Sequence, residues 1–308
     1  MSDILLKIGT RGSPLAIAQA NETRDRLMAA HGLPEEAFEV VVIKTTGDRV
    51  LDRPLSEIGG KGLFTREIEM ALTEGAIDIA VHSMKDMPVL QPDGLTLDCY
   101  LPREDPRDAF VSLRYGGIAD LPEGTVVGTS SLRRKSQLLW RRPDLKVVEF
   151  RGNVQTRLKK LADGVAEATF LAMAGLNRLR AVDVPHGVID TGDILPAVAQ
   201  GAIGIERRLD DTRIADMLAA IHDVPTGERL AAERAYLARL DGSCQTPIAG
   251  LAELDGAGRM RLRGEILAPD GSKCFAGETA GQVSDGARLG EQLADELLSQ
   301  AGPGFLAV

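Results

Sequence analysis

The chain has 308 residues, of which 44% are apolar and 26% are charged, a composition typical of a globular protein with two or three domains. The formal net charge of −9 disfavours nucleic acid as a partner, and no apolar run is long enough to span a membrane. The first residues lack the basic and then apolar pattern of a signal peptide, so we expect a cytoplasmic location.

Strand-like and helix-like segments alternate over the first hundred residues. Ser13 and Pro14 are typical of a helix start, because serine caps free backbone N–H groups and proline suits the first helical position. The alternation predicts a parallel sheet with crossover helices. The expected elements are strands over 4–8, 38–45 and 77–82, a helix from Ser13-Pro14, and a helix over 64–74.

A polar, proline-punctuated stretch at 101–107 predicts a hinge, beyond which the alternation resumes as a second α/β lobe. After Pro225 the pattern becomes that of a small α+β domain with tight Asp-Gly hairpin turns. The expected elements of these two regions are strands over 109–113, 125–128, 146–150 and 168–172, helices over 132–141, 154–162, 226–240 and 287–299, and hairpins over 248–262 and 264–277.

Two strand-to-helix turns, at 9–14 and 128–134, are rich in hydroxyl and arginine side chains. The second opens a stretch, 128–160, with ten basic residues and only two acidic ones. A helix start offers free N–H groups and a positive dipole end, so these turns predict a site for several anions. Arginine suits carboxylates as well as phosphates, and no Walker A or GxGxxG pattern is present. Capping hydroxyls beside solvated arginines are the alternative interpretation.

Three further features are candidates for chemistry or motion. Lys85 and Asp86 follow a predicted strand. Lys85 is expected to bind an anion and Asp86 to stabilise a developing cation. The alternative is that Asp86 only forms a turn. Cys244 lies in a glycine-containing loop. It is interpreted either as an accessible nucleophile or attachment point, or as an inert thiol. Residues 48–60 form a glycine-flanked loop, interpreted either as a lid or as a plain surface loop. Without CxxC or HExxH, no metal site is predicted.

Several ordered motifs along nearly the whole chain, together with the cysteine loop at 241–247, resemble the porphobilinogen deaminase (hydroxymethylbilane synthase) family. The motifs are TRGSPLA at 10–16, GGKGLF at 59–64, AVHSMKD at 80–86, REDPRDAF at 103–110, GTSSLRR at 128–134, RGNV at 151–154 and LPAVAQG at 195–201.

The resemblance implies a transferase of tetrapyrrole (haem-type) biosynthesis. It would join four molecules of porphobilinogen into hydroxymethylbilane with release of ammonia. The resemblance further implies a dipyrromethane cofactor bound covalently through Cys244, catalysis by Asp86, and a monomer. The residues that match cofactor- or substrate-binding positions are Arg11, Ser13, Lys61, Ser83, Lys85, Thr129, Ser130, Ser131, Arg133, Arg134, Arg151, Arg157, Arg178 and Gln200.

The same resemblance implies an α/β fold of two doubly wound, periplasmic-binding-protein-like lobes plus a small α+β C-terminal domain that carries the cofactor cysteine. The implied domains are residues 1–101 with 201–219, residues 107–195, and residues 224–308. Departures from the family pattern are confined to positions that affect lid contacts and backbone shape more than the chemistry: Glu57, Asn177, Ala199 and Ser243.

Two rival interpretations remain at this stage. A non-catalytic anion-binding protein would also have two α/β lobes with a hinge, but it leaves the Cys244 domain without a role. A nucleic-acid binder would use the basic stretch 128–160, but only 4% of the residues are aromatic, which leaves little for base stacking.

Overall fold

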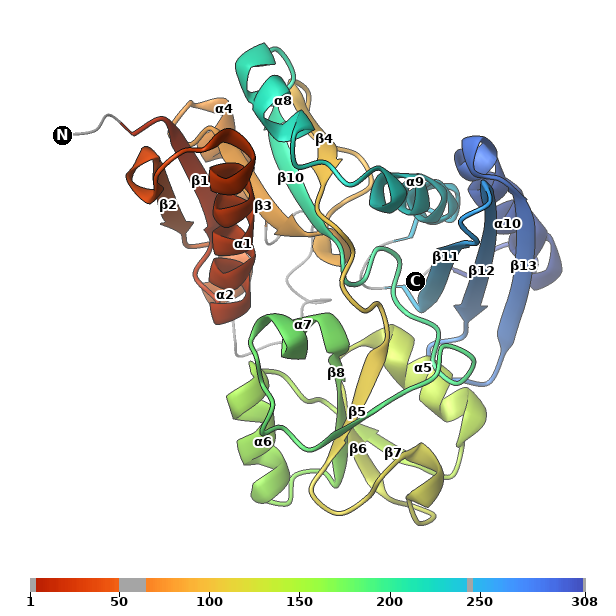
Figure 1. The fold of residues 1–308 in the computed structure, drawn as a ribbon. Coiled ribbons are helices and arrows are strands. Elements are labelled where there is room, and N and C mark those ends of the chain that lie inside the picture. Colours follow the sequence, from red (N-terminus) through yellow and green to blue (C-terminus); the bar gives the residue numbers. More distant parts are fainter. Residues whose placement is uncertain (1–3, 50–64, 243–245, 307–308) are drawn as a thin grey trace. The chain divides into compact units, whose positions relative to one another are not determined.

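The computed structural model describes residues 4–49, 65–242 and 246–306. These residues form three sheets (Figure 1). The chain divides into two compact units, Met1–Arg103 with Ala202–Gly227 and Glu104–Gly201 with Glu228–Val308. Within the described ranges, no helix is both long and apolar enough to cross a membrane. The predicted lid, 48–60, lies outside the described residues from residue 50 onward.

The first unit is built on one five-stranded sheet. Its elements are β1 (Leu6–Arg11), α1 (Pro14–His31), β2 (Phe38–Ile43), α2 (Thr46–Arg49), α4 (Arg66–Thr73), β3 (Ile79–Ser83), β4 (Leu95–Tyr100), β10 (Ile203–Arg208) and α8 (Thr212–Ala219). The strand order is β2-β1-β3-β10-β4, with β1 parallel to β2 and β3. The prediction of a parallel sheet is wrong for β10, which is antiparallel to β3 and β4 because it enters the sheet when the chain returns from the second unit.

The first helix begins where the sequence predicts. The Ser13 hydroxyl accepts a hydrogen bond from the Ala16 N–H at 3.2 Å, and Gly32 ends the helix with φ of 63°, a left-handed conformation that favours glycine. Leu27 of α1 packs with Ile214 of α8 on one face of the sheet. Helix α4 packs in a separate apolar cluster on the other face, so helices cover the sheet on both sides.

The second unit contains a five-stranded sheet of the same design. Its elements are β5 (Asp108–Ser112), β6 (Val126–Gly128), α5 (Leu132–Arg141), β7 (Lys146–Val148), α6 (Val154–Ala162), β8 (Ala168–Ala172), α7 (Met173–Arg178) and β9 (His186–Val188). The strand order is β7-β6-β8-β5-β9, with β5 antiparallel to its two neighbours as β10 is in the first sheet. Leu138 of α5 and Leu161 of α6 lie in clusters on opposite faces. The expected fold class of two doubly wound lobes is therefore confirmed.

A smaller sheet completes the second unit. Its elements are α9 (Val224–Arg239), β11 (Ile248–Leu254), β12 (Arg259–Leu267), β13 (Cys274–Gln282) and α10 (Gly286–Ala301). β12 pairs antiparallel with both β11 and β13, so the two predicted hairpins share one strand. Leu293 of α10 packs so closely on this sheet that a Cβ on Gly277 would lie 3.0 Å from it. The small α+β domain is confirmed.

Residues 195–201 tie the larger sheet to the smaller one inside the second unit. The Leu195 carbonyl accepts a hydrogen bond from Arg133 Nη1 of α5 at 2.7 Å. The Ala199 N–H donates to Glu233 Oε2 of α9 at 2.6 Å, and Glu233 is fully buried. This short segment therefore fixes the position of the arginine-bearing helix α5 relative to the small sheet.

Ala199 carries backbone strain, because its φ is 60°, in the left-handed region. That region costs a residue with a side chain roughly 1–2 kcal/mol. We expect Ala199→Gly to raise the free energy of unfolding by about 1 kcal/mol, since relief of the strain exceeds the extra freedom of glycine in the unfolded chain. Urea unfolding followed by circular dichroism measures the change. Ala197→Gly, where φ is not positive, is the matched control and should lower stability; an equal loss in both variants would contradict the assignment.

Candidate functional site

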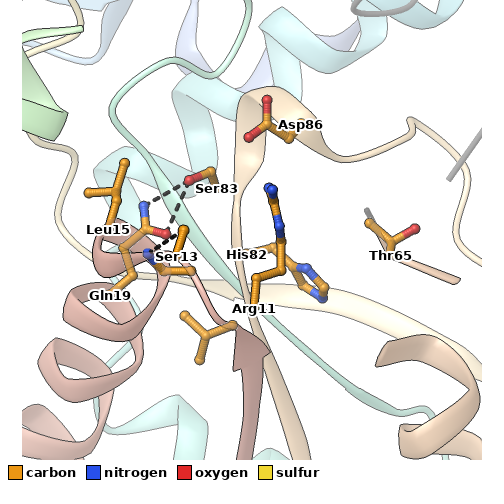
Figure 2. Close-up of a pocket in the computed structure, with 10 residues that line it drawn as sticks. Arg11, Ser13, Leu15, Gln19, Thr65, His82, Ser83 and Asp86 are labelled. Carbon is orange, nitrogen blue, oxygen red and sulfur yellow. Dashed lines mark hydrogen bonds between the residues drawn. The ribbon is translucent and has the colours of Figure 1, made fainter. Parts of the chain in front are cut away.

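Ten residues of the first unit line an open cavity (Figure 2). It is formed at the end of β1, the first turns of α1, and the end of β3 with the turn that follows. The carboxyl ends of strands are where α/β sheets bind ligands. The lining residues are Arg11, Ser13, Leu15, Ala16, Gln19, Thr65, Val81, His82, Ser83 and Asp86. Four residues predicted from separate motifs, Arg11, Ser13, Ser83 and Asp86, are thus brought together.

The turn between β1 and α1 supplies positive charge to the cavity. Arg11 is the last residue of β1, and Ser13 caps the start of α1 two residues later. The positive end of the helix dipole lies here, next to the half-buried Arg11 side chain. In Figure 2 the Arg11 side chain extends along the cavity in the direction of Asp86. This corner is suited to a ligand that carries carboxylates.

The turn after β3 presents Asp86 to solvent. Met84–Asp86 form one 3-10 turn, in which Met84 is 1% exposed and anchors the turn in the core. Asp86 is exposed and Lys85 half-buried. A carboxylate held on a rigid turn at the rim of a cavity can stabilise a cationic group without reorganisation of the protein.

Besides Thr65, two polar residues of the cavity were not predicted as site residues. Gln19 of α1 is 4% exposed, and it exchanges hydrogen bonds of 2.8 and 3.1 Å with the Ser83 hydroxyl. His82 is 6% exposed, and its Nε2 lies 3.1 Å from Glu206 Oε2. No local signal marks these residues, because their partners lie 64 and 124 positions away in the chain.

In the second unit, the predicted hydroxyl side chains organise the start of α5. The Ser131 hydroxyl accepts from the Arg134 N–H at 3.4 Å, and the Thr129 hydroxyl accepts from the Ser131 N–H at 3.2 Å. The exposed Ser130 accepts at its hydroxyl from the Phe150 N–H at 3.0 Å. Ser131 therefore caps α5, as the alternative interpretation of this turn expects, whereas Thr129 and Ser130 hold the backbone around it.

Arg133 and Arg134 are buried rather than solvated, with exposures of 5% and 7%. Both contact Asp108, which is fully buried: Arg133 Nη2 lies 2.8 Å from Oδ2 and Arg134 Nη2 lies 2.7 Å from Oδ1. Gln200 Nε2 also donates to Asp108 Oδ1, at 2.8 Å. Burial alone would raise the pKa of Asp108, but the charges of the two arginines hold it well below its usual range. Sequence reasoning missed Asp108, although it found Arg133, Arg134 and Gln200.

Arg157 extends this buried network. The Phe170 carbonyl accepts hydrogen bonds from Arg134 Nη1 at 3.2 Å and from Arg157 Nη1 at 3.1 Å. Burial, and next the charge of Arg134, lower the pKa of Arg157 to about 10, so it stays charged at neutral pH. Nearby, Arg151 is half-buried, whereas Arg178 Nη1 donates to the Gly201 carbonyl at 3.1 Å.

The charges of the network fit an anionic cofactor or substrate. Arg133, Arg134 and Arg157 bring three positive charges to it. Within the described ranges, Asp108 is the one carboxylate that accepts hydrogen bonds from Arg133 and Arg134. The Nε atoms of Arg133 and Arg134 are buried without a hydrogen-bond partner in the described part of the chain. Buried positive charge of this kind is stabilised by a ligand carboxylate.

The predicted site residues fall into three groups. The first unit holds Arg11, Ser13, Ser83, Lys85 and Asp86, and the second holds Thr129, Ser130, Ser131, Arg133, Arg134, Arg151, Arg157, Arg178 and Gln200. The remaining two, Lys61 and Cys244, lie outside the described residues.

Comparison with sequence families gives two matches that together cover most of the chain. Residues 6–216 match the family described as porphobilinogen deaminase, dipyromethane cofactor binding domain. Residues 228–299 match porphobilinogen deaminase, C-terminal domain. The order of the two matches along the chain agrees with the fold, in which the small sheet follows the two larger ones.

Individual proteins give the same result. A porphobilinogen deaminase of Paracoccus denitrificans is 69% identical over 97% of this chain and 96% of its own length. A chloroplastic porphobilinogen deaminase of Pisum sativum is 55% identical over 98% of this chain and 83% of its own length. Among solved structures, the periplasmic aliphatic sulphonate binding protein of Escherichia coli covers 77% of this chain and 70% of its own at 16% identity, with a TM-score of 0.42, too low to carry an argument.

Proposed function

The chain belongs to the porphobilinogen deaminase family, and we propose that Asp86 is its catalytic residue and Cys244 its point of cofactor attachment. The protein is a transferase of tetrapyrrole biosynthesis that acts on porphobilinogen and uses a dipyrromethane cofactor. The single observation that best supports the role of Asp86 is that it lines the same cavity as Arg11, Ser13 and Ser83.

Asp86 is placed to handle positive charge. When ammonia leaves porphobilinogen with the electron pair of the C–N bond, the ring system that remains is an electron-poor cation. A fixed carboxylate at the cavity rim stabilises that charge more strongly than water does, because it needs no reorientation. The positive charges around it, Arg11 and Lys85, act instead on the acetate and propionate groups of the substrate.

The binding role is divided between direct contact and support. The residues proposed to bind cofactor or substrate carboxylates directly are Arg11, Ser13, Lys61, Ser83, Lys85, Thr129, Ser130, Ser131, Arg151, Arg157, Arg178 and Gln200. Arg133 and Arg134 belong to the same proposed set, but each uses both terminal nitrogens within the protein: Arg133 on Leu195 and Asp108, and Arg134 on Phe170 and Asp108. Their contribution is therefore mainly their positive charge. The cofactor, when bound, supplies the pyrrole chain on which the product grows.

Cys244 is proposed as the attachment point because the other two cysteines are poor nucleophiles. Burial, the main cause, raises the pKa of Cys99 to about 12 and that of Cys274 to about 11. The thiolate is the reactive form of cysteine, so both side chains are almost entirely unreactive thiols at neutral pH. The Cys99 thiol also donates to the Leu218 carbonyl at 3.5 Å.

Intact mass spectrometry tests the attachment directly. We expect the purified protein to exceed its sequence mass by one dipyrromethane unit, and Cys244→Ser to show the bare sequence mass. Cys274→Ser is the matched control and should keep the adduct. A wild-type protein that is unmodified when purified without heating, or an adduct that persists in Cys244→Ser, would remove Cys244 from this role.

We also propose three domains, over residues 1–101 with 201–219, 107–195 and 224–308, and a cytoplasmic monomer without a nucleic-acid partner. The net charge of −9 supports the absence of a nucleic-acid partner, because nucleic acids bind positively charged proteins. Light scattering of the purified protein tests the monomer: a mass of twice the chain's 32.9 kDa would overturn it.

A further inference from the structure

A buried acid–imidazole pair lies beneath the cavity of the first unit. Glu206 is fully buried, and its Oε2 lies 3.1 Å from Nε2 of His82, which is 6% exposed and lines the cavity. The second carboxylate oxygen, Oε1, has no hydrogen-bond partner among the described residues. None of the roles assigned above uses this pair.

The sheet holds the pair in a fixed arrangement. In the antiparallel ladder of β3 and β10, His82 lies opposite Gly204 and Ala80 lies opposite Glu206, so both side chains project from the same face. That face packs against α4, whose Glu69 is close enough for the charges of Glu206 and His82 to act on it. With Nε2 occupied by Glu206, Nδ1 is the ring nitrogen that remains for the cavity.

The reaction needs a proton acceptor, a role separate from the stabilisation of positive charge proposed for Asp86. In each condensation the C–N bond of the incoming porphobilinogen breaks, and its electron pair leaves with ammonia. The terminal ring, itself a former porphobilinogen from the second condensation onward, forms a C–C bond at its free α-carbon. That carbon must then lose its hydrogen as a proton so that the electron pair of the C–H bond returns to the ring.

We propose that Nδ1 of His82, oriented by Glu206, accepts this proton. The C–H bond breaks, an N–H bond forms on His82, and the proton then passes to the released ammonia, which leaves as ammonium. Protons and electrons therefore balance without any further reactant. A carboxylate that accepts the Nε2–H orients the imidazole and stabilises the imidazolium after proton uptake, as in other acid–imidazole pairs.

The surroundings support this assignment. Arg11 lines the same cavity as His82, so the imidazole lies beside a side chain suited to the carboxylates of the substrate. Glu206 is fully buried, and its Oε1 has no hydrogen-bond partner among the described residues, so the carboxylate is available to interact with the neighbouring imidazole. The inference rests on the proposed function of this cavity, because it requires the terminal ring to enter it.

The test is His82→Gln, which keeps a polar side chain of similar length, with porphobilinogen deuterated at its free α-carbon as the probe. We expect turnover to fall on the order of 100-fold, with KM changed far less, and a primary isotope effect to appear. Glu206→Gln should lower turnover less, because the ring is still held by a hydrogen bond. His31→Gln, at the exposed end of α1, is the control and should leave turnover unchanged. Intact mass of each variant shows that the cofactor is loaded.

A second readout does not depend on turnover. Nitrogen-15 NMR of the resting wild-type enzyme at neutral pH should show His82 with its proton on Nε2 and none on Nδ1. A proton on Nδ1 would overturn the proposal, as would His82→Gln with wild-type turnover and no isotope effect. If either result overturns the role of His82 while Asp86→Asn is still inactive, the proposed function stands. If the wild-type protein does not consume porphobilinogen, the proposed function itself is wrong.

Discussion

Asp86→Asn is expected to lower turnover of porphobilinogen on the order of 100- to 1,000-fold or more, with little loss of stability. The loss in rate follows because a neutral amide of the same shape cannot stabilise the cation that forms when ammonia leaves. The fold is expected to survive because Asp86 is exposed and the buried Met84 anchors its turn. Steady-state assays of ammonia release, together with thermal unfolding of the same samples, measure both quantities.

The control for Asp86 is another exposed aspartate of the first unit. Asp93 lies in the loop before β4, away from the cavity-lining residues, and Asp93→Asn should leave turnover and stability unchanged. Asp86→Glu keeps the charge but moves it by one methylene, so an activity between those of wild type and Asp86→Asn is expected. Near-normal turnover of Asp86→Asn would remove Asp86 from the mechanism.

Asp108→Asn is expected to lower the free energy of unfolding by about 3–5 kcal/mol, the usual cost of removing one partner from a buried ion pair. The substitution leaves Arg133 and Arg134 buried without their counter-charge. Urea unfolding at neutral pH measures the loss. Asp105→Asn is the matched control three residues earlier. Its ion pair with Arg107 at 2.6 Å includes an exposed arginine and is not fully buried, so it is worth about 0–1 kcal/mol.

The contribution of Asp108 to the free energy of unfolding also depends on pH. The arginine charges hold the pKa of Asp108 in the folded protein well below its unfolded value of roughly 3.9. Its stabilising contribution is therefore fully present above that value and is lost as the pH falls toward the folded-state pKa. The difference in stability between wild type and Asp108→Asn should shrink below about pH 4. A difference that stays constant between neutral and acidic pH would contradict this account.

Helices with strong local signals were predicted closely. The predicted α5 and α6 have the observed bounds, Leu132–Arg141 and Val154–Ala162. Each follows a capping side chain, Ser131 or Asn153, that accepts a hydrogen bond from the helix's own backbone. Such interactions span three residues, so the local sequence contains all the information they need.

Strand direction was predicted poorly, for a physical reason. Alternating hydrophobicity shows that a segment is a buried strand, but a strand's neighbours and direction depend on where the chain returns to the sheet. β10 is antiparallel to β3 because the chain reaches it from the second unit. Strands β4, β9 and β10 were not predicted as elements, and β9, with three residues, is too short to show a period.

The sequence by itself determined the chemistry that this protein can offer: the hydroxyl and arginine turns, the carboxylate at position 86, the loop cysteine, and the family that these motifs identify. Only the tertiary structure decided which charges neutralise one another. Asp108 and Glu206 received no role from the sequence, yet they hold Arg133, Arg134 and His82. Their partners lie 25, 26 and 124 residues away, and burial, which makes these contacts strong, exists only after the sheets have packed.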